Sequence, residues 1–304
     1  MPLDGVLVVD KPAGLTSHDV VDVVRKAAHQ RKVGHTGTLD PDATGVLVLC
    51  LGRATRLVRF LQAGRKTYVA TAQLGAVTAS QDASGEVTAE TDASHVDEDD
   101  VREALERFRG EIEQVPPMVS ALKVDGERLH EKARRGEVVE REPRPVTIHE
   151  LVLEHFEGGG PRPELRFRVT CSAGTYVRTL AHDLGTALGV GGHLTDLRRV
   201  SNGPFTEGVA TPLSEIEACA DPDELEDQLV DLLTATSHLE RVTIDDADLA
   251  RRLTHGGQLA EQGIDGVYTV AFDGRLVGVY RDRDGAGRPE VVLLRPEQLE
   301  GTRS

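Results

Sequence analysis

Cysteine is scarce in this sequence, and long apolar runs are absent. The cysteines are odd in number and far apart, so they predict neither a disulfide framework nor a metal site; they are Cys50, Cys171 and Cys219. No run approaches the roughly 20 apolar residues of a membrane helix, and the first residues show neither a basic leader nor a small-residue cleavage site. We therefore expect buried structural thiols in a cytoplasmic protein that does not enter membranes.

Positive charge is also in short supply. The 35 Lys and Arg residues are outnumbered by 51 Asp and Glu residues, which gives a net charge of −16. That total argues against a nucleic-acid partner, because phosphate contacts need Lys and Arg. The distribution is uneven, however: residues 22–66 hold nine basic residues against three acids, whereas residues 82–106 and 221–231 are strongly acidic. Since local fields decide binding, the window 22–66 is a candidate anion-binding surface, and the acidic remainder can equally be a solvation device.

The sequence shows no internal repeat, no low-complexity linker and no regular alternation of strands and helices. Its 304 residues suffice for about two domains of roughly 150 residues. The irregular mixture of elements predicts an α+β fold around a largely antiparallel mixed sheet. We place the boundary near 236–241, between a larger part at 1–236 and a small β-rich domain at 240–304, where "GVYTVAFDGRLVGVYRD" predicts a hairpin with "DG" at its turn.

Local patterns predict the elements around one glycine-rich loop. "GVLVVDKP" is a short strand that Pro12 ends, and "SHDVVDVVRKAAH" is an amphipathic helix that Ser17 caps. "GRATRLVRFLQAG" predicts a helix with arginines at three-residue spacing, and "DEDDVREALERFRGE" a helix that begins in acid, as the helix dipole prefers. "KTYVATAQLG" alternates like a strand, and "PELRFRVTCSAGTYVRTLAHDLGTAL" predicts a strand, a glycine turn and a helix.

Asp40 lies in the loop of "GHTGTLDPDATGVLVLCLGRATR", just before a strand that reads as buried. A carboxylate in such a turn is often only an Asx-turn former or a helix cap. Here other polar residues lie near Asp40 in the sequence, since His35 and several threonines share its loop. Elsewhere in the chain, "KTY" and "GTYVRT" contain a tyrosine and an arginine that the fold could bring to the same place. A carboxylate nucleophile in a dry pocket needs such a cation to stay ionised. The spacing alone identifies no reaction, so both interpretations stay open.

Six stretches resemble, in order, the motifs of the TruB family of tRNA pseudouridine synthases. They are "LVVDKPAGLTSHDVV", "VGHTGTLDPDATGVLVLCLGRATR", "KTYVATAQLG", "PPMVSALKVDGERLHEKARRG", "CSAGTYVRTLAHDLG" and "GGHLTDLRRVSNGPF", and together they cover most of residues 3–215. The pattern G-H-x-G-x-L-D-P is highly specific. The resemblance implies a pseudouridine synthase fold for residues 1–236, followed by a PUA-like domain at 240–304.

The resemblance also implies a reaction. Enzymes of this family convert uridine 55 in the tRNA T-loop to pseudouridine, breaking the bond from N1 to ribose C1′ and rejoining the uracil through C5, without a cofactor or a metal. Asp40 matches the catalytic aspartate. A carboxylate suits this task because it can trap an electrophilic sugar carbon, as in retaining glycosidases. Addition to C1′, addition to uracil C6 and deprotonation of the sugar remain open as chemical paths.

Three further residues match family members that act on the flipped base. The target uridine is stacked in the T-loop and must be flipped out, and His35 matches the histidine that contacts the RNA where the base was. Tyr68 matches the tyrosine that packs on the uracil and serves in proton transfer at C5. Arg178 matches the arginine that pairs with the catalytic aspartate.

The remaining expected site residues have supporting roles in the family. Tyr176 and Leu197 match residues that line the base pocket. Lys11 and Pro12 belong to the "DKP" motif beside the site, and Asp82, in "SQDASGE", matches an acid near the cleft. These assignments rest on the resemblance, since each residue type also occurs commonly in ordinary packing.

Residues from about 120 to 145 resemble the family's mobile segment, which closes over the T-arm. Val119 and His130 stand where the family commonly has tyrosines. The expected partner is tRNA, held at the T-arm and through the C-terminal domain at the acceptor stem, by a monomeric enzyme. Two alternatives remain: a subunit of a guide-RNA-dependent pseudouridine synthase, and a tRNA-folding chaperone that acts by binding alone. The compact length favours the stand-alone bacterial type.

Overall fold

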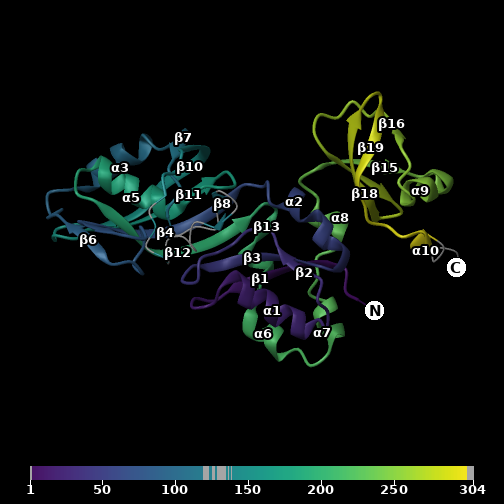
Figure 1. The fold of residues 1–304 in the computed structure, drawn as a ribbon, viewed down its shortest axis with the longest axis horizontal. Helices are drawn as coiled ribbons and strands as arrows, with labels where there is room; N and C mark the ends of the chain where they lie inside the picture. The colour runs from purple at the N-terminus through teal and green to yellow at the C-terminus, as the bar shows by residue number, and fades with distance from the viewer. Residues whose placement is uncertain are drawn as a thin grey trace. The chain divides into compact units, whose positions relative to one another are not determined.

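The chain forms two compact units in a computed structural model that describes residues 2–118, 123–124, 127–128, 135, 137 and 139–299 (Figure 1). Unit 1 comprises Met1–Pro41, Gly45–Ala63 and Gly203–Ser304, and unit 2 comprises Asp42–Thr44 and Gly64–Asn202. Within the described ranges, no helix has both the length and the apolar character needed to cross a membrane.

The first sheet of unit 1 is built on β1 (Gly5–Lys11) and β3 (Thr44–Leu51). They pair antiparallel from Gly5 opposite Leu51 to Lys11 opposite Gly45, while β2 (Val33–His35) adds to β3 and β14 (Thr211–Pro212) runs parallel to β1. Nearly every residue of β1 and β3 is buried, as expected of Val- and Leu-rich strands covered on both faces.

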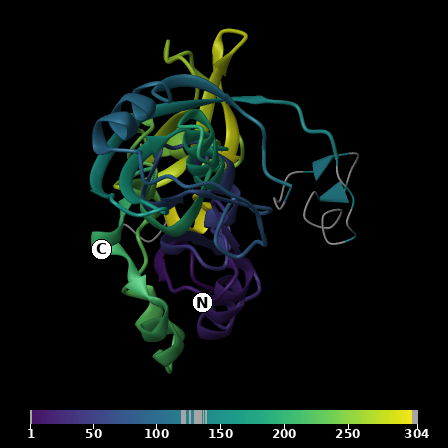
Figure 2. The ribbon, with the colours of Figure 1, turned by 90° about the vertical axis from the view of Figure 1, so that its left-hand side faces the viewer.

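Helices of unit 1 cover this sheet. The helix α1 (Ser17–Ala27) buries its valines and packs beside α6 (Leu213–Ala218), which Figure 2 shows from a second direction. The other short elements of this part of unit 1 are η1 (Gly52–Leu57), α2 (Val58–Leu61), β13 (Phe205–Thr206), η2 (Glu207–Val209), α7 (Pro222–Glu226) and α8 (Leu232–Ala235).

The C-terminal part of unit 1 is a five-stranded sheet with the order β15-β17-β18-β19-β16. Its elements are β15 (Glu240–Ile244), α9 (Ala247–Thr254), β16 (Leu259–Ala260), β17 (Tyr268–Phe272), β18 (Arg275–Arg283), β19 (Ala286–Val292) and α10 (Pro296–Leu299). The predicted hairpin is confirmed, because Asp273 and Gly274 join β17 to β18 with φ of 46° and 67°. Leu276, Val279 and Leu293 pack into the same apolar cluster as β1 and β3.

Unit 2 contains an antiparallel sheet with the order β12-β4-β11-β10-β7. Its main elements are β4 (Lys66–Leu74), β7 (Gly110–Gln114), β10 (Arg144–Glu157), β11 (Glu164–Cys171), β12 (Gly192–Asn202), α3 (Glu98–Glu106) and α5 (Val177–Ala187). Two small hairpins are β5 (Ala76–Thr78) with β6 (Val87–Glu90), and β8 (Lys123–Val124) with β9 (Glu127–Arg128). The α+β class and the mostly antiparallel mixed sheet predicted from the sequence are confirmed.

One local prediction is wrong and another is refined. The cap of α1 is Thr16, whose hydroxyl accepts from the amide of Asp19 while the Asp19 carboxylate accepts from the amide of Thr16. The predicted cap, Ser17, instead turns its hydroxyl inward. The arginine-bearing segment is helical over residues 52–61, as predicted, but it begins as the 3₁₀ helix η1 before the single α-helical turn of α2. At its start Gly52 has φ of 57°, and the Asp4 carboxylate accepts from the next amide, Arg53, at 2.6 Å.

Candidate active site

The loop that carries Asp40 is fixed on its C-terminal side by a buried lysine. Lys11, at the end of β1, is fully buried, and its ammonium donates to the carbonyls of Pro12 at 2.7 Å, Leu15 at 2.7 Å and Pro41 at 2.9 Å. The amide of Gly14 donates to the same Pro41 carbonyl at 2.9 Å. The residue directly after Asp40 is therefore tied to the turn between β1 and α1.

The same loop is fixed on the N-terminal side of Asp40 by Ser17. Its buried hydroxyl donates to the Leu39 carbonyl at 3.0 Å and accepts from the Leu39 amide at 2.8 Å. Both neighbours of Asp40 are thus held, while the Asp40 residue itself stays half-buried. A carboxylate presented on a backbone fixed at both sides keeps its position during a reaction.

His35 ends β2, a few residues before Asp40. Its Nδ1 accepts from the amide of Gly37 at 3.3 Å, so the neutral ring carries its proton on Nε2. The next residue, Thr36, donates its amide to Val48 on β3 at 3.0 Å. The half-buried imidazole is therefore held at the start of the Asp40 loop, with a donor on its other nitrogen.

In unit 2, the buried side chain of Arg178 forms an ion pair with the half-buried Asp82. Arg178 lies in the first turn of α5, and its Nη1 is 3.3 Å from Oδ2 of Asp82. The other oxygen of Asp82 accepts from the hydroxyls of Ser80 at 2.5 Å and Ser84 at 2.6 Å, and from the Ser84 amide at 3.1 Å. Asp82 is thus the observed partner of Arg178, and its role in the site stays a prediction. The expected pairing of Arg178 with Asp40 stays a prediction.

Two glutamines that no sequence motif indicated hold the start of α5. The buried side chain of Gln114 accepts from the amide of Tyr176 at 3.0 Å and donates to its carbonyl at 3.3 Å. Gln81 accepts from the hydroxyl of Thr179 at 2.8 Å. Neither glutamine belongs to a recognisable pattern, so only the three-dimensional structure reveals that they position Tyr176 and the loop of Asp82.

Tyr68 and Leu197 share one face of the ladder between β4 and β12. Leu197 pairs with Ala70, and Ala70 points to the same face as Tyr68 because side chains on a strand alternate. Tyr68 is 7% exposed and Leu197 is half-buried. The two residues are diagonal neighbours across the strands, a distance that an aromatic ring can bridge.

The thiols are as expected at two of three positions. Burial raises the pKa of Cys50 to about 12 and that of Cys171 to about 11, so both stay protonated and unreactive at neutral pH. Cys219 is half-buried, and the prediction of burial is wrong there. It follows a short surface helix, α6, which buries only its apolar side.

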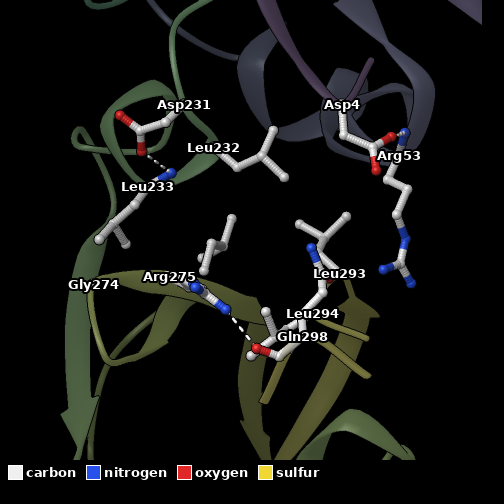
Figure 3. A pocket seen from close by; sticks show the side chains of 11 residues that line it. Asp4, Arg53, Asp231, Leu232, Leu233, Gly274, Arg275, Leu293, Leu294 and Gln298 are labelled. Carbon is white, nitrogen blue, oxygen red and sulfur yellow. Dashed lines mark hydrogen bonds between the residues drawn. The ribbon is translucent and has the colours of Figure 1, made fainter. Parts of the chain in front are cut away.

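A pocket of about 200 Å³ lies within unit 1, between the β1–β3 region and the C-terminal sheet (Figure 3). Its two carboxylates serve local structure: Asp4 accepts from the Arg53 amide, and Asp231 caps α8 by accepting from the amide of Leu233 at 2.9 Å. The guanidinium of Arg275 donates to the carbonyl of Gln298. None of the expected site residues lines this pocket, so it is not a candidate for the chemistry.

Comparison with known proteins identifies the family. Three family models match consecutive stretches: the TruB family pseudouridylate synthase N-terminal domain at residues 25–177, the tRNA pseudouridylate synthase B C-terminal domain at 178–239, and the tRNA pseudouridine synthase II C-terminal domain at 239–294. Proteins named tRNA pseudouridine synthase B are similar over most of the chain. That of Thermobifida fusca is 46% identical over 95% of this chain and 98% of its own, and that of Symbiobacterium thermophilum is 52% identical over 84% and 82%.

Solved structures agree on the fold. A Cbf5-Nop10-Gar1 complex contains a chain that is 28% identical, with a TM-score of 0.75 over 98% of this chain and 87% of its own. An H/ACA RNP bound to a substrate RNA containing 2′-deoxyuridine contains one that is 27% identical, with a TM-score of 0.74 over 97% and 86%. The resemblance seen in the motifs is confirmed over nearly the whole length, and this chain belongs to the TruB family of pseudouridylate synthases.

Proposed function

We propose that this enzyme isomerises uridine 55 in the T-loop of tRNA to pseudouridine, with Asp40 as the catalytic carboxylate. The observation that carries the proposal is the double anchoring of the Asp40 loop, at Leu39 by Ser17 and at Pro41 by Lys11. The names of relatives that are 44–52% identical, tRNA pseudouridine synthase B, support the substrate and the reaction.

The proposed reaction is balanced without an external reagent. The N1–C1′ bond of uridine breaks, a C5–C1′ bond forms, C5 loses its proton and N1 gains one. The electron-poor C1′ that appears when the glycosidic bond breaks is a site that an aspartate carboxylate can stabilise or trap. Such a carboxylate must be ionised, and a nearby guanidinium keeps it so.

The other site residues have complementary roles in the proposal. Arg178 is the guanidinium, shared between Asp40 and its observed partner Asp82. Tyr68 packs on the flipped uracil and takes the proton from C5, while Tyr176 and Leu197 line the base pocket. His35 would fill the place that the base leaves in the RNA, which lowers the cost of flipping.

The proposal includes a stand-alone mode of action on the T-arm, as a monomer in the cytoplasm. The chains from H/ACA assemblies are 26–28% identical, clearly below the 44–52% of the tRNA pseudouridine synthase B proteins. This difference favours tRNA as the substrate without a guide RNA. Half of the segment at about 120–145, including His130, lies outside the described residues, as does Val119 just before it. Its closure over the T-arm is part of the proposal.

The decisive experiment uses the purified protein and an unmodified tRNA transcript. Site mapping of pseudouridine should give a single new signal at position 55 after incubation with the wild type, and none with Asp40→Asn. Modification at another position, or modification only after addition of a guide RNA, would contradict the proposal. A protein that binds and refolds tRNA without forming pseudouridine would support the chaperone alternative.

A further inference from the structure

Three arginines from two distant parts of the chain converge on one carboxylate in unit 1. Glu290, on β19, has Oε2 at 2.9 Å from Nη2 of Arg59 on α2, and Oε1 at 2.5 Å from Nη2 of Arg283 on β18. Arg281, also on β18, has its Nε at 3.6 Å from the same Oε1. Both oxygens of Glu290 are therefore shared among three guanidinium groups.

A fourth arginine extends this group along the arginine-bearing segment. Arg56 donates from Nη1 to the carbonyl of Val292 at 2.6 Å, and Arg59 donates to the carbonyl of Glu290 at 3.1 Å. The segment begins as a 3₁₀ helix, in which side chains three apart lie above one another. The three-residue spacing noted in the sequence thus directs Arg56 and Arg59 to the same strand, β19. We call Arg56, Arg59, Arg281, Arg283 and Glu290 the arginine cluster.

The acidic side chain within the same stretch of β18 points away from the cluster. Asp282 accepts from the amides of Gln262 and Gly263 and from the hydroxyl of Tyr268 at 2.7 Å, so it serves the opposite face of the sheet. This follows from strand alternation, which places residues 281 and 283 on one face and 282 on the other. Asp284, the next acid, is paired with Arg288 at 3.1 Å.

The arginine cluster carries a surplus of three positive charges on a chain with a net charge of −16. The side chain of Glu290 is only 16% exposed, whereas those of Arg59 and Arg283 are each 58% exposed. The carboxylate therefore sits beneath the guanidinium groups, and the surplus positive charge faces the solvent. One carboxylate cannot balance several like charges held this close, so an approaching anion lowers the energy of the cluster.

The cluster and Asp40 lie at opposite ends of β3. The Asp40 loop is tied to Lys11, which pairs with Gly45 at the start of β3, whereas η1 follows Leu51 at its end. At about 3.3 Å per residue, these ends are roughly 20 Å apart. A ligand that reaches both places must be an extended polyanion rather than a single nucleotide.

We infer that the arginine cluster is a docking surface for phosphates of the substrate RNA that lie beyond the T-loop, with Glu290 as an internal counter-ion that these phosphates displace. Guanidinium groups bind phosphate oxygens in a bidentate manner, so the cluster can exchange one carboxylate for RNA oxygens. The inference rests on the proposed function for the identity of the RNA. It also brings Arg281 and Arg283 into the RNA surface, although both lie outside the basic window 22–66.

The test compares two RNAs, full-length unmodified tRNA and an isolated T-arm stem-loop. In Arg281→Ala/Arg283→Ala, we expect the KM for full-length tRNA to rise about five- to tenfold, with kcat unchanged. The dependence of log affinity on log salt should become shallower by about 0.7–0.9 for each lost phosphate contact. The KM for the stem-loop should change by less than about twofold, because the short RNA does not reach the cluster.

Glu290→Gln should have the opposite effect on tRNA binding to the arginine substitutions. Removal of the internal counter-ion frees the guanidinium groups, so full-length tRNA should bind about two- to fivefold more tightly, with a steeper salt dependence. A merely structural role for Glu290 would instead weaken binding or leave it unchanged. Arg281→Lys/Arg283→Lys keeps the charge and should retain most of the salt dependence, which separates charge from side-chain packing.

A matched control removes the same charge elsewhere. Arg102→Ala/Arg107→Ala alters two arginines of 54% and 61% exposure that pair with Glu98 and Glu103 along α3. If this control and Arg281→Ala/Arg283→Ala have the same KM for tRNA and the same salt dependence, the inference is wrong. Equal effects on tRNA and on the stem-loop would overturn it too. If the wild type forms no pseudouridine on either RNA, the proposed function fails, while a direct tRNA-binding titration of the same variants still decides the role of the cluster.

Discussion

The Asp40 loop in unit 1 and the start of α5 in unit 2 hold their site residues in different ways. In unit 1, the contacts of Lys11 and Ser17 are with backbone groups on either side of Asp40. In unit 2, Arg178 is bound through its own guanidinium to the carboxylate of Asp82. One arrangement fixes a backbone position, and the other fixes a charge.

This difference predicts different consequences for substitutions. A change in the backbone anchors of unit 1 should displace the reacting carboxylate and destabilise the loop together. A change in the ion pair of unit 2 should remove a counter-charge from the site while leaving the fold in place. Substitutions at Asp40, Arg178 and Lys11 separate these two kinds of consequence.

Asp40→Asn should abolish isomerisation. The amide has the shape of the carboxylate but neither its charge nor its nucleophilicity, so we expect turnover to fall below about 1% of the wild type. Affinity for tRNA should stay within about tenfold, because most RNA contacts lie elsewhere. Single-turnover assays with excess enzyme measure the first quantity and filter binding the second. Residual turnover well above this limit would exclude Asp40 as the catalytic group.

Arg178→Met should lower turnover severely without unfolding the protein. Removal of the guanidinium leaves the half-buried carboxylate of Asp82, and its proposed second partner Asp40, without a counter-charge. We expect kcat to fall by at least about 100-fold at neutral pH, because the catalytic carboxylate then lacks the cation proposed to orient it and balance its charge. Asp82→Asn, which keeps the guanidinium, should cost less. Near-normal turnover of Arg178→Met at neutral pH would show that the pair is not needed.

Lys11→Met should affect stability and turnover together, as a backbone anchor would. The substitution removes the three ammonium–carbonyl hydrogen bonds from a fully buried side chain, so we expect the free energy of unfolding to fall by about 2–4 kcal/mol. Displacement of the loop should also lower kcat about tenfold or more. Ser17→Ala is the milder companion and should cost about 1–2 kcal/mol. Chemical denaturation and single-turnover rates on the same samples check both parts, and a loss of turnover without loss of stability would contradict the anchoring role.

The sequence predicted the parts of the fold that local patterns specify. Alternating apolar residues and "DG" fixed the hairpin around Asp273, and the run of acids before α3 marked its start correctly. The helix expected at 52–64 is present over residues 52–61, but its 3₁₀ beginning was not predicted; there the carboxylate of Asp4, almost 50 residues away, accepts from the amide of Arg53. Long-range side-chain contacts of this kind leave no local trace in the sequence.

Only those residues of the candidate site that belong to family motifs could be predicted from the sequence. The family motifs named Asp40, Tyr68 and Arg178, but no pattern indicated Gln114 or the inward turn of Ser17. Both side chains bind backbone groups whose positions are set by the fold. A polar residue in such a role cannot be told apart, in the sequence, from a polar residue without one. The sequence indicated part of the arginine cluster, since Arg56 and Arg59 belong to the basic window 22–66. It did not indicate Arg281 and Arg283, which lie outside this window.

Lys66 allows a specific test of how a buried charge affects the stability of unit 2, and the expected effect is the smallest of those predicted. Its side chain is 7% exposed on β4, its ammonium donates to the carbonyl of Gly64 at 3.1 Å, and burial together with repulsion from Arg199 lowers its pKa to about 8. In the unfolded chain the pKa of lysine is about 10.4, so between about pH 8 and 10.4 the unfolded state binds a proton that the folded state has lost. The free energy of unfolding should therefore rise with pH in this window, by about 1–3 kcal/mol relative to Lys66→Met, in which the group is absent. Urea denaturation of both proteins at pH 7.5, 9 and 10.5 measures the difference, and parallel curves for the two would mean that the folded state keeps Lys66 charged throughout.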